Sequence, residues 1–228
     1  MRQEQLNQTS EQLRTPERRG FNFGQVRMMF AHADPELRLN QLSSQVVGDI
    51  KVDLDKTTWV SKTSRRDGEQ KVTIGGQKLP DEIAKIFAWG VDTKEDEIVL
   101  KTAHEISHVF QNKKGLEQQL LLFLSGSNEI NENAQEYIEL YSALSGLGPV
   151  TGLPTMEIYH QQTESEKARV TQGLALDTRI LEDITELIAA YSLGDEYFNF
   201  RLAGSDVSDE DKSTVARCVV AVYHKHIS

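Results

Sequence analysis

The sequence contains a single cysteine, only six histidines and no long apolar run. With Cys218 as its only cysteine, the chain cannot form an intramolecular disulfide framework, a cysteine-rich zinc module or a cysteine-ligated iron–sulfur cluster. Any metal site must therefore use histidine, aspartate or glutamate. The longest apolar stretch, residues 120–124, is far shorter than the roughly 20 residues that span a bilayer. We expect no membrane segment, and because residues 1–20 lack the apolar core of a secretory signal, cytoplasmic residence is the default expectation.

Basic residues are also scarce. The chain has 25 Lys and Arg against 35 Asp and Glu, which gives a formal net charge of −10. Nucleic-acid-binding proteins usually carry a basic patch or stripe, so we expect no nucleic-acid partner. Hydrophobic residues make up 38% of the 228 residues, which is enough to bury the core of one ordinary domain.

The polar and apolar pattern predicts an α+β fold. Residues 1–24 are polar and are expected to form a flexible arm, and residues 25–228 a single domain. Partial apolar alternation near residues 46–54, an apolar pair at 59–60 and the run 71–74 predict two or three short strands, with a turn at 66–68. This sheet subdomain covers about residues 45–90. Helical spacing follows over about residues 92–228, with helices predicted from 92 or 93 to about 113–115 and at 116–124, 132–144, 164–170, 178–193 and 209–223.

The strongest chemical signal is an HExxH sequence formed by His104, Glu105 and His108 inside a predicted helix. Residues four apart lie on one helical face, so both imidazoles can reach a single ion while Glu105 points beside it. This arrangement suits Zn²⁺ bound by two histidines, with the glutamate as general base for a water molecule. The sequence therefore predicts a zinc site.

A catalytic zinc site needs a third protein ligand. Metzincins place a glycine and a third histidine after the motif, but Gln111 and Lys114 occupy those positions here, so that class is excluded. The best downstream candidates are Glu182 and Glu186, four residues apart on a predicted helix with a broad apolar face. Two carboxylates on such a helix are costly unless a cation compensates them. One can bind the metal while the other accepts the N–H of a ligand histidine.

His104, Glu105 and His108 on one helix, with Glu182 and Glu186 on a later one, resemble the gluzincin metallopeptidases, the thermolysin-like group that includes small single-domain members. The resemblance implies a zincin-like metallopeptidase domain, with a small mixed sheet packed on the HExxH helix and a mainly helical C-terminal half that carries the glutamate helix. It implies His104, His108 and Glu182 as zinc ligands, Glu105 as general base, and Glu186 as the partner of a ligand histidine. The expected substrate is a peptide or protein.

The interval between the motif and Glu182 is longer than in thermolysin, which leaves Glu129 as a rival third ligand. Glu129 follows Asn128 and so resembles the start of the thermolysin glutamate helix. No acid lies four residues beyond Glu129, however, and its surroundings are strongly polar. We therefore favour Glu182.

Hydrolysis also needs a donor that stabilises the oxyanion. Tyr197, which follows a predicted helix end at Gly194, is the preferred candidate. Tyr191 is a second candidate, although its position on the glutamate helix favours a core role. The remaining candidates are His160, His224 and His226. The last two also allow a latent enzyme in which the C-terminal tail enters the cleft, and His32 is expected to be merely exposed.

Three functions remain open from the sequence. The first is a zinc-dependent peptidase, which is favoured because Glu105 is needed for chemistry but not for metal binding. The second is a non-catalytic zincin-fold protein with structural zinc or a regulatory or binding role. The third is an acidic helical interaction protein in which the HExxH sequence binds no metal.

Overall fold

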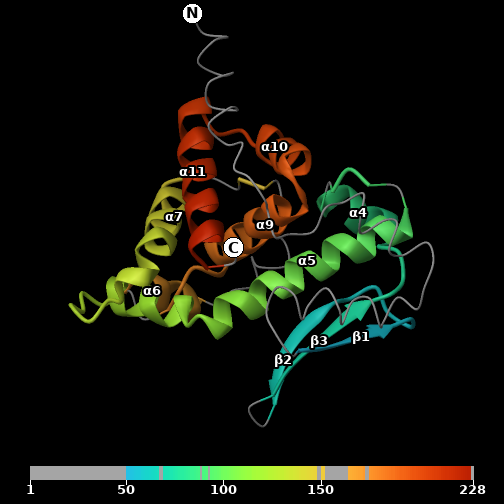
Figure 1. Cartoon of the computed structure of the whole chain (residues 1–228), viewed down its shortest axis with the longest axis horizontal. Coiled ribbons are helices and arrows are strands. Elements are labelled where there is room, and N and C mark those ends of the chain that lie inside the picture. Colours follow the sequence, from blue (N-terminus) through green and yellow to red (C-terminus); the bar gives the residue numbers. More distant parts are fainter. Residues whose placement is uncertain are drawn as a thin grey trace, which may run out of the picture.

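The computed structural model describes residues 50–66, 69–87, 89–91, 93–147, 150–151, 164–172 and 175–226 (Figure 1). The arm predicted at residues 1–24 lies outside these ranges, as do His32 and His160. The strands are β1 (Lys51–Asp55), β2 (Lys62–Arg66) and β3 (Glu69–Gly75). The helices are α4 (Asp81–Phe87), α5 (Lys94–Lys113), α6 (Leu116–Leu124), the 3₁₀ turn η1 (Glu132–Ala134), α7 (Gln135–Ser145), α8 (Glu164–Thr171), α9 (Thr178–Leu193), α10 (Asp195–Ala203) and α11 (Asp209–His226). The predicted α+β class is confirmed: a small sheet precedes a mostly helical remainder.

The sheet has the order β1-β3-β2, with β1 parallel and β2 antiparallel to β3. Val52 lies opposite Val72, and both are fully buried on one face of the sheet. This face forms a hydrophobic cluster with Ile98 and Val109 of α5. Strand β2 begins later than predicted. The apolar pair at 59–60 was expected to lie in a strand, but the strand is Lys62–Arg66, which has a polar sequence. It is an edge strand of the described sheet and is held by backbone pairing, for which apolar alternation is not required.

Helix α5 lies between the sheet and the other helices, as Figure 1 shows. Its N-cap is Thr93, whose side chain accepts a hydrogen bond from the backbone N–H of Asp96 at 3.1 Å. The helix ends at Lys113, and Gly115 follows with a positive φ of 63°. Both predicted ends of this helix are thus confirmed. Because α5 is buried on several sides, its two histidines are carried by a central element of the fold.

Helix α9 packs against α5 and also contacts α7, α10 and α11. Asp177 caps its N-terminus by accepting a hydrogen bond from the backbone N–H of Arg179, and Gly194, with a φ of 124°, ends it. The span predicted at residues 178–193, with its end at Gly194, is confirmed. Helix α10 was not predicted, because Gly194 interrupts the helical pattern and only a few buried residues of α10 mark a core face. These are Phe198, Arg201 and Leu202.

None of the helices in the described ranges combines the length and the apolar character needed to cross a membrane.

Gly75 is required where β3 passes close to the loop before β2. A Cβ atom at Gly75 would lie 2.3 Å from the backbone carbonyl carbon of Trp59. We expect Gly75→Ala to lower the free energy of unfolding by about 1–3 kcal/mol, because the backbone must shift to make room. Urea denaturation followed by circular dichroism measures this change. Gly146→Ala is the matched control, since Gly146 has a φ of −89° and no atom within 4 Å of its would-be Cβ. Equal stability of the two variants would contradict the prediction.

Candidate metal centre

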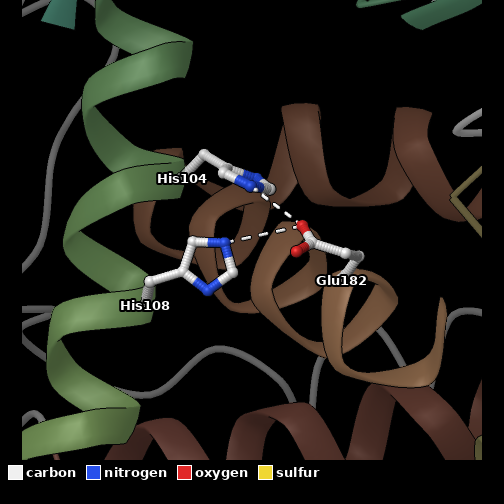
Figure 2. A group of neighbouring side chains, drawn as sticks. All are labelled: His104, His108 and Glu182. Carbon is white, nitrogen blue, oxygen red and sulfur yellow. Dashed lines mark ion pairs between the residues drawn. The ribbon is translucent and has the colours of Figure 1, made fainter. Parts of the chain in front are cut away.

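The two histidines of the HExxH sequence meet Glu182 across the packing of α5 on α9 (Figure 2). Glu182 Oε2 lies 3.2 Å from His104 Nε2 and 3.5 Å from His108 Nε2. The three donor atoms all lie within 4.8 Å of one another, and the described ranges hold no other such group of three histidine, cysteine or acidic side chains. Residues more than 70 positions apart in the sequence are therefore brought to one point.

The geometry of these donors fits a zinc ion. Zinc binds histidine nitrogen and carboxylate oxygen at about 2.0–2.2 Å, which places two tetrahedral ligands roughly 3.3–3.6 Å apart. The two nitrogen–oxygen separations, 3.2 and 3.5 Å, are close to that spacing. Two nitrogens and one oxygen are also a typical donor set for catalytic zinc, and three protein ligands leave the fourth position for water or substrate.

The electrostatics of the group call for a positive charge. Burial by itself would lower the pKa of His104 and raise that of Glu182. The hydrogen bonds and opposite charges between them outweigh burial, so the pKa of His104 is raised well above its ordinary value and that of Glu182 is strongly lowered. The side chains are only 16% and 15% exposed. In the metal-free state Glu182 is thus an anion beside a protonated His104, and a metal ion would bind here in place of that proton.

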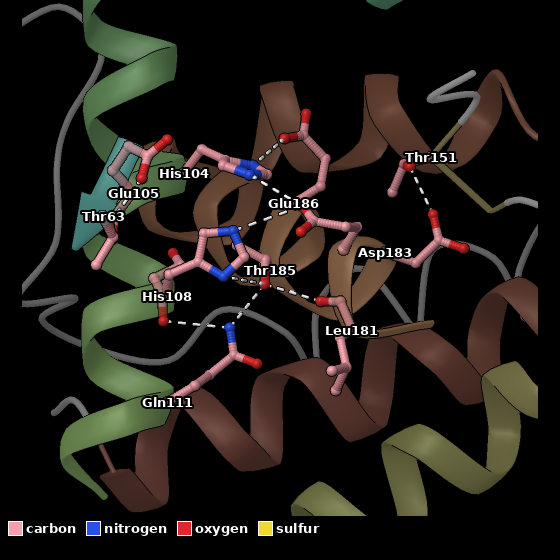
Figure 3. Close-up of polar contacts among 12 residues, drawn as sticks. Thr63, His104, Glu105, His108, Gln111, Thr151, Leu181, Asp183, Thr185 and Glu186 are labelled. Carbon is pink, nitrogen blue, oxygen red and sulfur yellow. Dashed lines mark hydrogen bonds and ion pairs between the residues drawn. The ribbon is translucent and has the colours of Figure 1, made fainter. Parts of the chain in front are cut away.

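Glu186 lies on the far side of His104 from the sheet (Figure 3). Its Oε2 is 3.1 Å from His104 Nδ1, and its Oε1 is 3.3 Å from Nε of Arg201. Burial would raise the pKa of Glu186, but the hydrogen bond from His104 and the charge of Arg201 outweigh it and lower the pKa. Glu186 therefore occupies the place expected for the partner of a ligand histidine. Arg201 was not predicted as a site residue because α10 was not predicted; an arginine within an apolar segment was the available signal.

A second side chain of α9 reaches the other histidine. Thr185 Oγ1 lies 3.4 Å from His108 Nδ1, and Thr185 is fully buried. This contact was not predicted either. Thr185 directly precedes Glu186, so a polar residue within the apolar face of the predicted helix was the only sequence signal.

Glu105 lies beside the three donors but is not one of them. Its Oε2 accepts a hydrogen bond of 2.7 Å from the hydroxyl of Thr63 in β2, and the residue is 8% exposed. Figure 3 shows Glu105 next to His104 with its carboxylate turned toward Thr63. The edge strand of the sheet therefore orients this carboxylate.

The two tyrosine candidates have different surroundings. Tyr191 is 1% exposed, its ring packs edge-on against Phe198, and its hydroxyl lies 3.2 Å from His224 Nε2, which supports a core role. Tyr197 lies on α10. Its pKa is raised by burial and by the negative charge of Glu186, so the hydroxyl keeps its proton. The interaction of Tyr197 with the charge of Glu186 keeps it as the candidate donor.

The remaining candidates lie away from the three donors. Glu129 is exposed, and its backbone N–H bonds the hydroxyl of Ser127. His224 contacts Tyr191, and His226 lies near Phe110, with 6.1 Å between ring centroids. Glu129 does not belong to the donor group, which favours Glu182 as the third ligand. His224 and His226 do not belong to it either, which gives no support to a latent state in which these histidines bind the metal.

Comparison of the chain with protein-family models, with curated proteins and with solved structures gives no significant match. The functional assignment therefore depends on the residues and the geometry of the site.

Proposed function

We propose that this chain is a zinc-dependent peptidase of the gluzincin kind, acting on a peptide or protein substrate. The observation that carries the proposal is the distance of Glu182 Oε2 from the two histidine Nε2 atoms, 3.2 and 3.5 Å, in a site that also contains Glu105. His104, His108 and Glu182 would bind the zinc ion. The packing of β3 and β2 on α5 supports a zincin-like domain made of a sheet subdomain and a helical subdomain.

Each residue of the site then has a defined task. Zinc, when bound, supplies a Lewis acid that makes a water molecule more acidic and polarises the carbonyl oxygen of the substrate. Glu105 takes a proton from the attacking water and delivers it to the leaving amine. The hydrogen bond from Thr63 fixes one carboxylate oxygen of Glu105, which holds the base in one orientation. Glu186 orients His104, and Tyr197 is the candidate donor to the oxyanion.

One observation favours the alternative of a non-catalytic protein with structural zinc. The carboxylate of Glu105 is buried and engaged with Thr63. If that contact were permanent, Glu105 would brace the sheet against α5 instead of moving protons. The three-ligand site would then serve only to join α5 to α9.

Metal removal separates these functions. We expect the purified protein to contain one equivalent of zinc, to hydrolyse a mixture of quenched fluorogenic peptides, to lose that activity with a chelator and to regain it with added zinc. Elemental analysis and fluorescence measure the two properties. Stoichiometric zinc without hydrolysis of any peptide would favour the structural role. Absence of zinc after exposure to zinc salts would contradict both roles and favour the metal-free interaction protein.

A further inference from the structure

The side chains behind His108 form a continuous buried hydrogen-bond network that links three helices. Tyr137 of α7 donates to Gln111 Oε1 of α5 at 2.5 Å, and Gln111 Nε2 donates to Thr185 Oγ1 of α9 at 2.7 Å. Thr185 Oγ1 then lies 3.4 Å from His108 Nδ1 (Figure 3). Tyr137, Gln111 and Thr185 have no measurable exposure, so water does not compete for these bonds.

The orientation of the Gln111 amide follows from its neighbours. Gln111 Nε2 lies 3.2 Å from the backbone oxygen of Ser107, which can only accept a hydrogen bond. The NH₂ group must therefore face Ser107 and Thr185, and the amide oxygen must face Tyr137. Burial raises the pKa of Tyr137 well above its ordinary value, so its hydroxyl keeps the proton that it donates.

The hydrogen bonds of the Thr185 hydroxyl can be assigned in the same way. A threonine hydroxyl has one proton to donate and two lone pairs. The proton goes to the backbone oxygen of Leu181 at 2.8 Å, and one lone pair receives Gln111 Nε2. The second lone pair is left to accept a proton from His108 Nδ1.

We propose that Thr185, held by Gln111 and Tyr137, is a positioning residue that keeps the proton of neutral His108 on Nδ1 and so leaves the lone pair of Nε2 facing Glu182. This bias matters because the carboxylate of Glu182, 3.5 Å from His108 Nε2, attracts the proton to the opposite nitrogen. Metal binding requires a bare nitrogen. Neutral groups thus orient the ring of His108 through its Nδ1 atom, whereas the carboxylate of Glu186 orients the ring of His104.

The effect on zinc affinity rests on the proposed zinc site, but the effect on the histidine ring does not. We expect Thr185→Val to weaken zinc binding by about 10–100-fold, as is typical when the partner of a ligand histidine is removed. In the metal-free protein, at a pH where His108 is neutral, ¹⁵N nuclear magnetic resonance of the ring should show a smaller fraction with the proton on Nδ1. Thr185→Ser keeps the hydroxyl and should restore both properties.

Thr102→Val is the matched control. Thr102 is a buried threonine of α5 whose hydroxyl donates to the backbone oxygen of Ile98 at 2.6 Å, the same bond that Thr185 makes to Leu181. Zinc affinity and the ring spectrum of His108 should match the wild type in this variant. Tyr137→Phe, which frees the distant end of the network, should shift both properties in the direction of Thr185→Val by a smaller amount.

Two results would overturn the inference. One is a ring spectrum of His108 that does not change between wild type and Thr185→Val. The other is an equal loss of zinc affinity in Thr102→Val, which would show that any lost buried hydroxyl has this effect. If the wild type binds no zinc, the proposed function fails, yet the ring spectra of the metal-free variants still decide whether Thr185 positions His108.

Discussion

Glu182→Ala should contain no zinc after dialysis, whereas Glu129→Ala should keep one equivalent. Glu182 supplies the only carboxylate oxygen in the donor group of the described residues, within 3.5 Å of both histidine nitrogens. Loss of the partner of a ligand already costs about 10–100-fold in affinity, so loss of a ligand itself should cost more. Elemental analysis of the dialysed proteins and titration with a competing zinc chelator measure the change.

Glu129 provides the matched control for this experiment. It is exposed and lies outside the donor group, so its replacement tests the rival ligand with the same chemical change. Circular dichroism of both variants shows whether the helices are retained. Zinc loss in Glu129→Ala together with wild-type zinc content in Glu182→Ala would reverse the assignment of the third ligand.

Glu105→Gln should separate zinc binding from catalysis. Glutamine has nearly the same shape and can still accept the hydrogen bond from Thr63, so zinc content and stability should not change. Glutamine cannot act as a base, however, and the loss of general base catalysis lowers kcat by about 10²–10⁴-fold. Steady-state hydrolysis of a quenched peptide, with zinc content measured on the same sample, records both effects.

The matched control is Glu95→Gln, which removes one negative charge from an exposed position in the first turn of the same helix. Its kcat should equal that of the wild type. A Glu105→Gln variant that retains wild-type kcat would remove Glu105 from the mechanism. If neither the wild type nor Glu105→Gln hydrolyses any peptide while both bind zinc, the structural role is favoured.

Local signals allowed several elements to be predicted closely. The span of α9 was predicted from its apolar face and from Gly194, and that of α5 from Thr93 and Gly115. These signals act within one helical turn of each helix end, so they can be recognised in the sequence. Strand β2 was predicted a few residues too early and helix α10 was missed, because a polar edge strand and a short helix after a glycine have no strong periodic pattern.

Side-chain contacts between distant segments could be predicted only in part. The pairing of Glu186 with a histidine of the HExxH sequence was expected, but Arg201 and the network of Thr185, Gln111 and Tyr137 were not. Their contacts join residues that lie on different helices, and each depends on how those helices pack and rotate against one another. Spacing along one helix carries no information about that rotation.

The sequence by itself determined which donors are available: with one cysteine and six histidines, the HExxH pair and a carboxylate are the candidate ligands of the proposed zinc site. It also determined the faces that those side chains share, because residues four apart in a helix lie on the same side. Only the tertiary structure decided that Glu182 meets both histidines, while Glu186 and Thr185 each contact a different one. The physical reason is that the packing of α9 on α5 sets these distances, and this packing depends on a core assembled from several helices.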